Sequence, residues 1–62
     1  MNTIKIGDKF QVIKSCNGEY VSIGDVLQIK AIQSDIVYVA SQTGATWIKM
    51  RWFKKGHLKE IL

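Results

Sequence analysis

Aromatic and basic side chains gather in the last third of this 62-residue chain. Aromatic rings stack on unpaired bases, and lysine and arginine side chains neutralise phosphates. Both kinds of side chain occur between residues 47 and 55, and two more stand at positions 30 and 38. The candidate set for binding nucleic acid or another partner is Lys30, Tyr38, Trp47, Lys49, Arg51, Lys54 and Lys55.

The net charge of +4 is unevenly placed along the chain. Residues 1–40 hold four basic and four acidic side chains, whereas residues 41–62 hold five basic side chains and one acidic side chain. The whole excess of positive charge therefore lies in the last third. This asymmetry favours an anionic partner, although a net charge of this size is also ordinary for the solubility of a small domain.

Residues that could support catalysis or hold a metal are few. His57 is the only histidine and Cys16 the only cysteine, and they lie far apart in the sequence. A general base needs its partner within hydrogen-bond reach, and a closed zinc site normally takes four ligands. We expect His57 to be a solvated corner residue and Cys16 to be a loop thiol or a half-buried thiol. The sequence thus predicts a non-enzymatic protein with no catalytic residue, no metal and no cofactor.

One sequence element occurs twice: Ile-Gly-Asp-x-Φ-Gln-Φ, where Φ is apolar, at residues 6–12 and 23–29. Glycine supplies a positive φ at low cost, and aspartate bonds to nearby backbone in a turn. Each copy is therefore interpreted as a turn that leads directly into a strand. Alternation after each turn predicts four core residues: Phe10, Val12, Leu27 and Ile29.

Period-two alternation predicts further strands at residues 26–32, 36–40, 45–52 and 58–62, after a first strand that starts at Phe10. In residues 26–32, Ala31 is expected to share the buried face of Leu27 and Ile29. Val37 and Val39 point inward if Tyr38 points outward. In residues 45–52 the inward set is Ile48, Met50 and Trp52, and the outward set is Trp47, Lys49 and Arg51.

Two stretches allow a second interpretation. Residues 47–62 can form a basic amphipathic helix, although Gly56 would cost it about 1 kcal/mol relative to alanine; the alternation from Ile48 to Trp52 favours a strand. Asn17-Gly18 can close a tight hairpin with residues 20–22 as its second arm. A longer excursion that closes at Gly24-Asp25 fits the sequence equally well.

Several features together resemble the SH3-like barrel. They are the two Gly-Asp strand starts, the alternation at Leu27/Ile29 and at Val37/Val39, Gly44 at a hairpin, and Leu58/Ile61 at the end. Over nearly its whole length the chain is similar to the short SH3-like proteins encoded by bacteriophages and bacteria. The resemblance implies an all-β fold, a five-stranded antiparallel SH3-like barrel with a long first loop, and often a single helical turn before the fifth strand. The chain lacks the aromatic pattern of signalling SH3 domains, so binding of proline-rich peptides is not implied.

The chain is long enough for a single domain, residues 1–62, and it has no secretory signal or long apolar run. We therefore expect a cytoplasmic protein with no membrane partner. The favoured function is nucleic-acid binding through the basic and aromatic face. The alternative is a protein-interaction module: a phage-type accessory protein that binds and modulates an acidic host protein, or a homodimer that covers Trp47.

Overall fold

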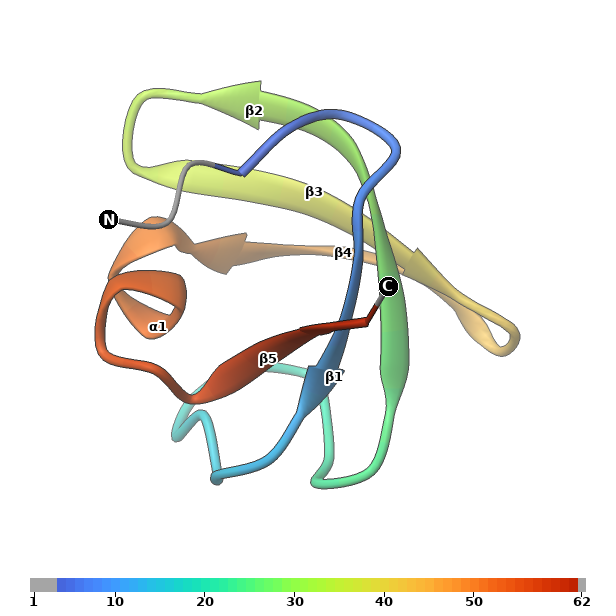
Figure 1. Cartoon of the computed structure of the whole chain (residues 1–62), viewed down its shortest axis with the longest axis vertical. Coiled ribbons are helices and arrows are strands. Elements are labelled where there is room, and N and C mark those ends of the chain that lie inside the picture. Colours follow the sequence, from blue (N-terminus) through green and yellow to red (C-terminus); the bar gives the residue numbers. More distant parts are fainter. Residues whose placement is uncertain (1–3, 62) are drawn as a thin grey trace.

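The computed structural model describes residues 4–61, which form one antiparallel sheet of five strands and a short helix (Figure 1). The strands follow the order β4-β3-β2-β1-β5 across the sheet. Their bounds, with the helix, are β1 (Lys9–Val12), β2 (Val26–Gln33), β3 (Ile36–Ser41), β4 (Gly44–Lys49), α1 (Met50–Lys54) and β5 (Leu58–Ile61). The predicted all-β class with five antiparallel strands is confirmed, whereas closure into a barrel stays a prediction. Leu62, which was expected in the last strand, lies outside the described residues.

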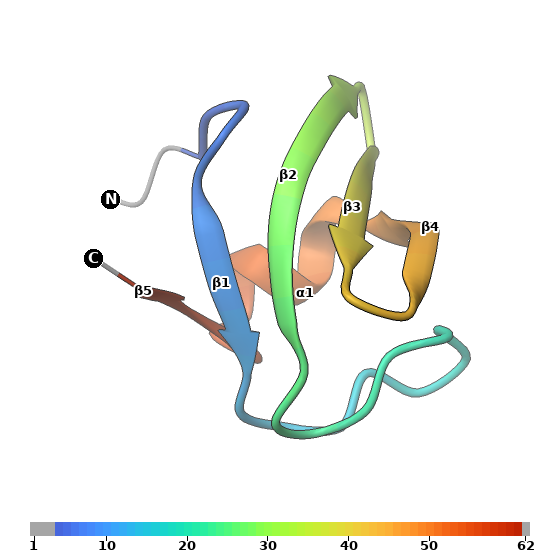
Figure 2. The ribbon, with the colours of Figure 1, turned by 90° about the vertical axis from the view of Figure 1, so that its right-hand side faces the viewer.

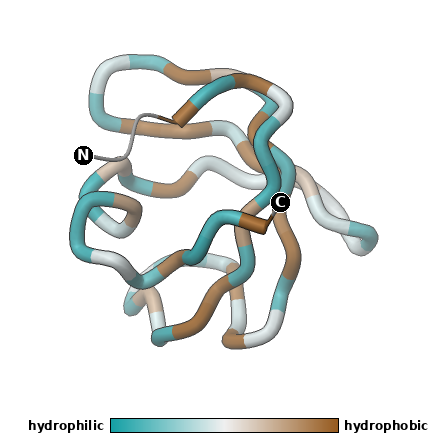
Figure 3. Tube along the Cα trace, in the orientation of Figure 1, coloured by the Kyte–Doolittle hydropathy of each residue, from teal (hydrophilic) through white to brown (hydrophobic). Residues whose placement is uncertain are grey.

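The core lies between the curved sheet and α1. Figure 2 shows β1 to β4 side by side with α1 behind them, and α1 contacts both β4 and β5. Apolar and polar residues alternate along the strands (Figure 3). The predicted inward positions of β1 to β4 are buried, with the exception of Ala31 in β2. The buried core consists of Phe10, Val12, Cys16, Leu27, Ile29, Val37, Val39, Ile48, Trp52, Phe53 and Leu58.

The repeated element forms the same turn twice. Gly7 and Gly24 have φ angles of 98° and 97°, in the region that favours glycine. In each copy the aspartate accepts from the backbone N–H three residues before it: Asp8 from Lys5 at 3.0 Å, and Asp25 from Ser22 at 2.9 Å. The prediction that these aspartates bond to nearby backbone is confirmed.

Each turn is also bonded to the strand that begins at the other turn. The N–H of Gly7 donates to the Ile29 carbonyl at 2.8 Å, and the N–H of Ile29 donates to the Asp8 carbonyl at 2.9 Å. The second turn makes the same two bonds. The N–H of Gly24 donates to the Val12 carbonyl at 2.8 Å, and the N–H of Val12 donates to the Asp25 carbonyl at 2.9 Å. Because Phe10 pairs with Leu27 midway between them, the two copies are related by a local two-fold arrangement.

A bulge in β2 changes which side chains face the core. The register with β3 shifts between Ile29 and Ala31, so that Ala31 pairs with Tyr38 and Ile32 pairs with the buried Val37. The expectation that Ala31 shares the buried face of Ile29 is therefore wrong. An extra residue in one strand reverses the alternation beyond it, and Ile32 packs partly buried against the core instead.

The strand predicted for residues 45–52 ends at Lys49, and residues 50–54 form α1. Trp52 and Phe53 are both buried, which a strand with one buried face does not allow for neighbouring residues but a helical turn does. Arg51 is exposed, as predicted, but it projects from α1 and not from a strand. The long helix over residues 47–62 is wrong.

Gly56 explains why α1 stops after five residues. Its φ is 80°, its N–H donates to the Phe53 carbonyl at 3.2 Å, and the next N–H, of His57, donates to the Trp52 carbonyl at 3.0 Å. These two bonds are those of a Schellman motif, which ends a helix on a left-handed residue. β5 follows at once, as predicted, and Leu58 is buried, but Ile61 is 39% exposed and does not return to the core.

Residues 13–25 form the loop between β1 and β2, and the longer of the two predicted excursions is the one observed. No strand forms at residues 20–22. Cys16 is buried under this loop, and Gly18 turns the chain with a φ of 87°. The helix α1 is far too short to cross a membrane, and the described part of the chain contains no helix that could.

Candidate nucleic-acid interface

Tyr38 and Trp47 form a ring pair on the outer face of the sheet. They are directly paired residues of β3 and β4, and their ring centroids lie 4.9 Å apart at an angle of 43°. The residues on either side of Tyr38, Val37 and Val39, are fully buried, which fixes Tyr38 on the opposite face. Trp47 remains 40% exposed. The outward orientation predicted for this pair is confirmed, and it leaves the Trp47 ring open to a partner.

Lys30 lies on the outer face, as alternation after the buried Ile29 predicts. In a bulge two residues of one strand oppose a single residue of the other, and here Lys30 and Ala31 stand opposite Tyr38. Lys30 is exposed. The bulge keeps Ala31 on this face as well, whereas regular alternation would have turned it toward the core.

A hollow of about 590 Å³ continues this face toward β1. Two lysines line it, Lys9 from β1 and Lys30 from β2, and its far wall is the β3–β4 turn at residues 41–43. Lys9 was not among the predicted site residues. Its position directly before the buried Phe10 marked it as exposed, but only the pairing of Lys9 with Gln28 places it next to Lys30.

The predicted basic residues near α1 do not all join this face. Lys49 is exposed and follows Trp47 by two residues along β4. Arg51 and Lys55 instead lie over the Trp52 ring, at 5.3 and 5.6 Å from its centroid. Cations at this distance over an aromatic face are attracted by its quadrupole. The two form a second basic site around Trp52.

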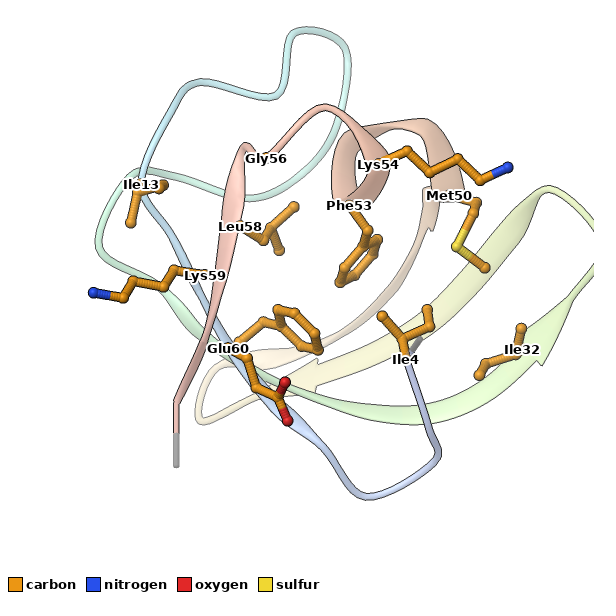
Figure 4. Close-up of a pocket in the computed structure, with 11 residues that line it drawn as sticks. Ile4, Ile13, Ile32, Met50, Phe53, Lys54, Gly56, Leu58, Lys59 and Glu60 are labelled. Atoms are coloured by element: carbon orange, nitrogen blue, oxygen red, sulfur yellow. The ribbon is translucent and has the colours of Figure 1, made fainter. Parts of the chain in front are cut away.

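Lys54 lies at neither the outer face nor the Trp52 ring. It lies at the edge of an apolar concavity of about 860 Å³, between α1 and β5, and its side chain points away from the centre (Figure 4). The seven predicted site residues are thus divided among the outer face, the Trp52 ring and this concavity. The apolar side chains that line the concavity are Ile4, Phe10, Ile13, Ile32, Met50, Phe53 and Leu58.

Glu19 contacts the second basic site, although the sequence analysis did not single it out. One oxygen of its carboxylate, Oε2, accepts hydrogen bonds from Trp52 Nε1 at 2.9 Å and from the backbone N–H of Lys49 at 3.1 Å. It reaches them from the loop of residues 13–25, about thirty positions earlier in the chain. A contact of this sequence separation leaves no local signal.

His57 is half-buried rather than a solvated corner residue. Its ring packs against Trp52 with the centroids 4.8 Å apart, and Nδ1 lies 3.0 Å from the carbonyl oxygen of Ser15. Because a carbonyl only accepts, Nδ1 carries the proton in this contact. Within residues 4–61 no three His, Cys, Asp or Glu side chains are grouped so that they could hold a metal ion.

Comparison with known proteins gives no match: no family profile, no curated protein sequence and no solved structure is significantly similar to this chain.

Proposed function

We propose that this protein is a non-enzymatic module of the cytoplasm that binds single-stranded nucleic acid on the outer face of its sheet. The observation that carries the proposal is the Tyr38–Trp47 ring pair, whose tryptophan is 40% exposed. Stacking on an exposed ring stabilises a bound base by roughly 1–3 kcal/mol, and it tolerates any base because every base has a π face.

Basic side chains flank the ring pair where a phosphate backbone would run. Lys30 lies beside Tyr38 across the bulge, Lys9 shares the hollow with Lys30, and Lys49 follows Trp47. Neutralising phosphates with these lysines releases counterions, which makes the affinity depend on salt. A small SH3-like barrel, as the sequence resemblance implies, would carry such a face on a rigid sheet.

A titration of a fluorescent single-stranded oligonucleotide at several salt concentrations tests the proposal. We expect Trp47→Ala to weaken binding about tenfold or more, because a stacking surface is lost. Trp47→Phe is the matched control and should retain most of the affinity. Lys30→Gln should reduce the slope of log affinity against log salt by about 0.7, the loss of one phosphate contact on a single strand.

Lys14→Gln is the matched control for Lys30→Gln. It removes one positive charge from an exposed residue whose backbone N–H bonds to the His57 carbonyl and not to β3 or β4, so the salt slope should stay close to that of the unmodified protein. No binding at low ionic strength, or an affinity that does not change with salt, would rule out nucleic-acid binding.

A second candidate is a protein-interaction module of the phage-encoded kind, with an acidic protein or a second copy of the chain as its partner. The observation that favours it is the position of Trp47 on β4, an edge strand of the sheet. A partner could cover the exposed tryptophan there. Sedimentation tests self-association, and affinity capture with the purified protein, compared with Trp47→Ala, tests an acidic partner.

A further inference from the structure

The carboxylate of Glu19 lies against the segment that joins the outer face to α1. Its two donors are the N–H of Lys49, two residues beyond Trp47, and Nε1 of Trp52. Arg51 and Lys55 are the cations on that same Trp52 ring. A nucleic-acid strand that runs from the ring pair toward these cations therefore passes the position of Glu19.

A phosphate group satisfies the same contacts. Like a carboxylate it is an anion that only accepts hydrogen bonds, so the two N–H groups that hold Glu19 suit either group. Neither N–H donor carries a charge of its own, and Arg51 and Lys55 lie over the ring of Trp52, whose Nε1 is one of the two donors. The position fits a phosphate and holds a side chain of the protein instead.

The segment that supplies Glu19 is held at this place by few bonds. Residues 17–22 lie below the β3–β4 hairpin in Figure 2. Among the hydrogen bonds of residues 4–61, those that link residues 17–22 to β4 or α1 are the two made by the Glu19 carboxylate. Tyr20, beside it, is 90% exposed. Val21 also packs partly buried against the core, so displacement of the Glu19 side chain breaks the polar link to the site while this part of the loop stays attached.

We infer that Glu19 occupies the place of a backbone phosphate of the bound strand, so that it competes with nucleic acid and is displaced on binding. The inference rests on the proposed function and extends it: the interface continues from Trp47 past Lys49 to the Trp52 ring, and the loop of residues 13–25 limits its affinity.

Two substitutions with equal change in charge test the competition. Glu19→Gln removes the charge of the competitor, and Glu60→Gln removes one charge on β5, which lies at the opposite edge of the sheet from β4. A like charge about 4 Å away in water costs about 1 kcal/mol, or fivefold in affinity. We expect Glu19→Gln to bind a single-stranded oligonucleotide about fivefold more tightly or better, and Glu60→Gln to change the affinity less than about twofold.

Glu19→Asp keeps the net charge but shortens the side chain, so it should reach the two donors less well and also bind more tightly. Far-UV circular dichroism establishes that each variant is folded. If Glu19→Gln is not folded, the affinity of Glu19→Asp alone tests the competition. Equal affinities for the Glu19 variants and Glu60→Gln would overturn the inference while leaving the proposed function intact.

A second readout follows Trp52 itself. In Trp47→Phe the remaining tryptophan is Trp52, whose emission should change when a bound phosphate replaces the Glu19 carboxylate at Nε1. The same titration of Trp47→Phe/Glu19→Gln, in which no carboxylate is displaced, should give a different change in emission; equal changes in the two proteins would contradict the displacement.

Sodium tripolyphosphate, an anion without bases, separates the two proposals. If it binds more tightly to Trp47→Phe/Glu19→Gln than to Trp47→Phe, and no oligonucleotide binds, the anion position stands and the nucleic-acid function fails. If neither tripolyphosphate nor the oligonucleotide binds any variant, the proposed function and the anion position are both wrong.

Discussion

Cys16 illustrates how one side chain is governed by the loop that buries it. Only 2% of its surface is exposed, and Sγ lies 3.7 Å from the carbonyl oxygen of Lys14. Removal from water raises the pKa of this thiol above its ordinary value of 9.0, and the nearby Glu19 carboxylate raises it further. The sequence predicted a loop thiol or a half-buried thiol, but its nearly complete burial depends on how residues 13–25 fold back over the core.

The raised pKa predicts a pH dependence of stability. In the unfolded chain the thiol ionises at its ordinary pKa, whereas in the folded protein it stays protonated to higher pH. The stability due to the neutral thiol is therefore complete below about pH 9 and is lost as the pH rises through the folded pKa. Urea unfolding from pH 7 upward should show a steeper alkaline loss for the unmodified protein than for Cys16→Ala. If the free energy of unfolding falls equally with pH in both proteins, the predicted contribution of the Cys16 thiol is contradicted.

At the scale of elements, the two Gly-Asp turns explain why β1 and β2 pair as they do. Each turn bonds its own backbone through aspartate and bonds the strand of the other copy through glycine. The register of Phe10 against Leu27 is thus held at both ends by the same device. A slip by one residue would turn both buried rows toward water and break both sets of bonds.

This arrangement predicts equal effects for equivalent substitutions. Asp8→Ala and Asp25→Ala each remove one carboxylate bond to a backbone N–H, and each should lower the free energy of unfolding by about 1–2 kcal/mol. Glu60→Ala removes the same charge from an exposed strand residue and should change it by less than about 0.5 kcal/mol. Chemical denaturation measures all three. If only one of the two aspartate substitutions lowers the free energy of unfolding, the two turns share a geometry but do not contribute equally to stability.

At the scale of the whole molecule, one core joins every element. All five strands, α1 and the loop residue Cys16 contribute buried side chains to a single cluster. The T-shaped contact of Phe10 with Phe53, 5.0 Å between centroids, connects β1 to the helix. In a chain of this size no element can keep its buried face without the others, which favours cooperative unfolding.

Two probes at different places should therefore report one transition. In Trp47→Phe, fluorescence follows Trp52 in α1, and far-UV circular dichroism follows mostly the strands. We expect the same urea midpoint from both probes, because α1 and the sheet share the core. A lower midpoint by fluorescence would mean that α1 and the Glu19 loop detach before the sheet unfolds.

Local sequence alone predicted the strands, both turns, most of the core and the outward ring pair. The physical reason is that side chains alternate across a strand, and that glycine and aspartate specify a turn within a few residues. The pair Trp52-Phe53 broke that alternation, and Gly56 followed a helix-ending pattern. Together they were a readable sign of α1.

Tertiary structure decided the rest. The bulge at Lys30 depends on how β2 meets β3, Lys9 joins the site because β1 lies beside β2, and Glu19 reaches Trp52 from thirty-three residues away. Contacts between segments distant in the chain leave no periodicity that a sequence can display. Residue types and their alternation thus determined the fold class and the aromatic face, and only the folded chain determined which charges stand beside it.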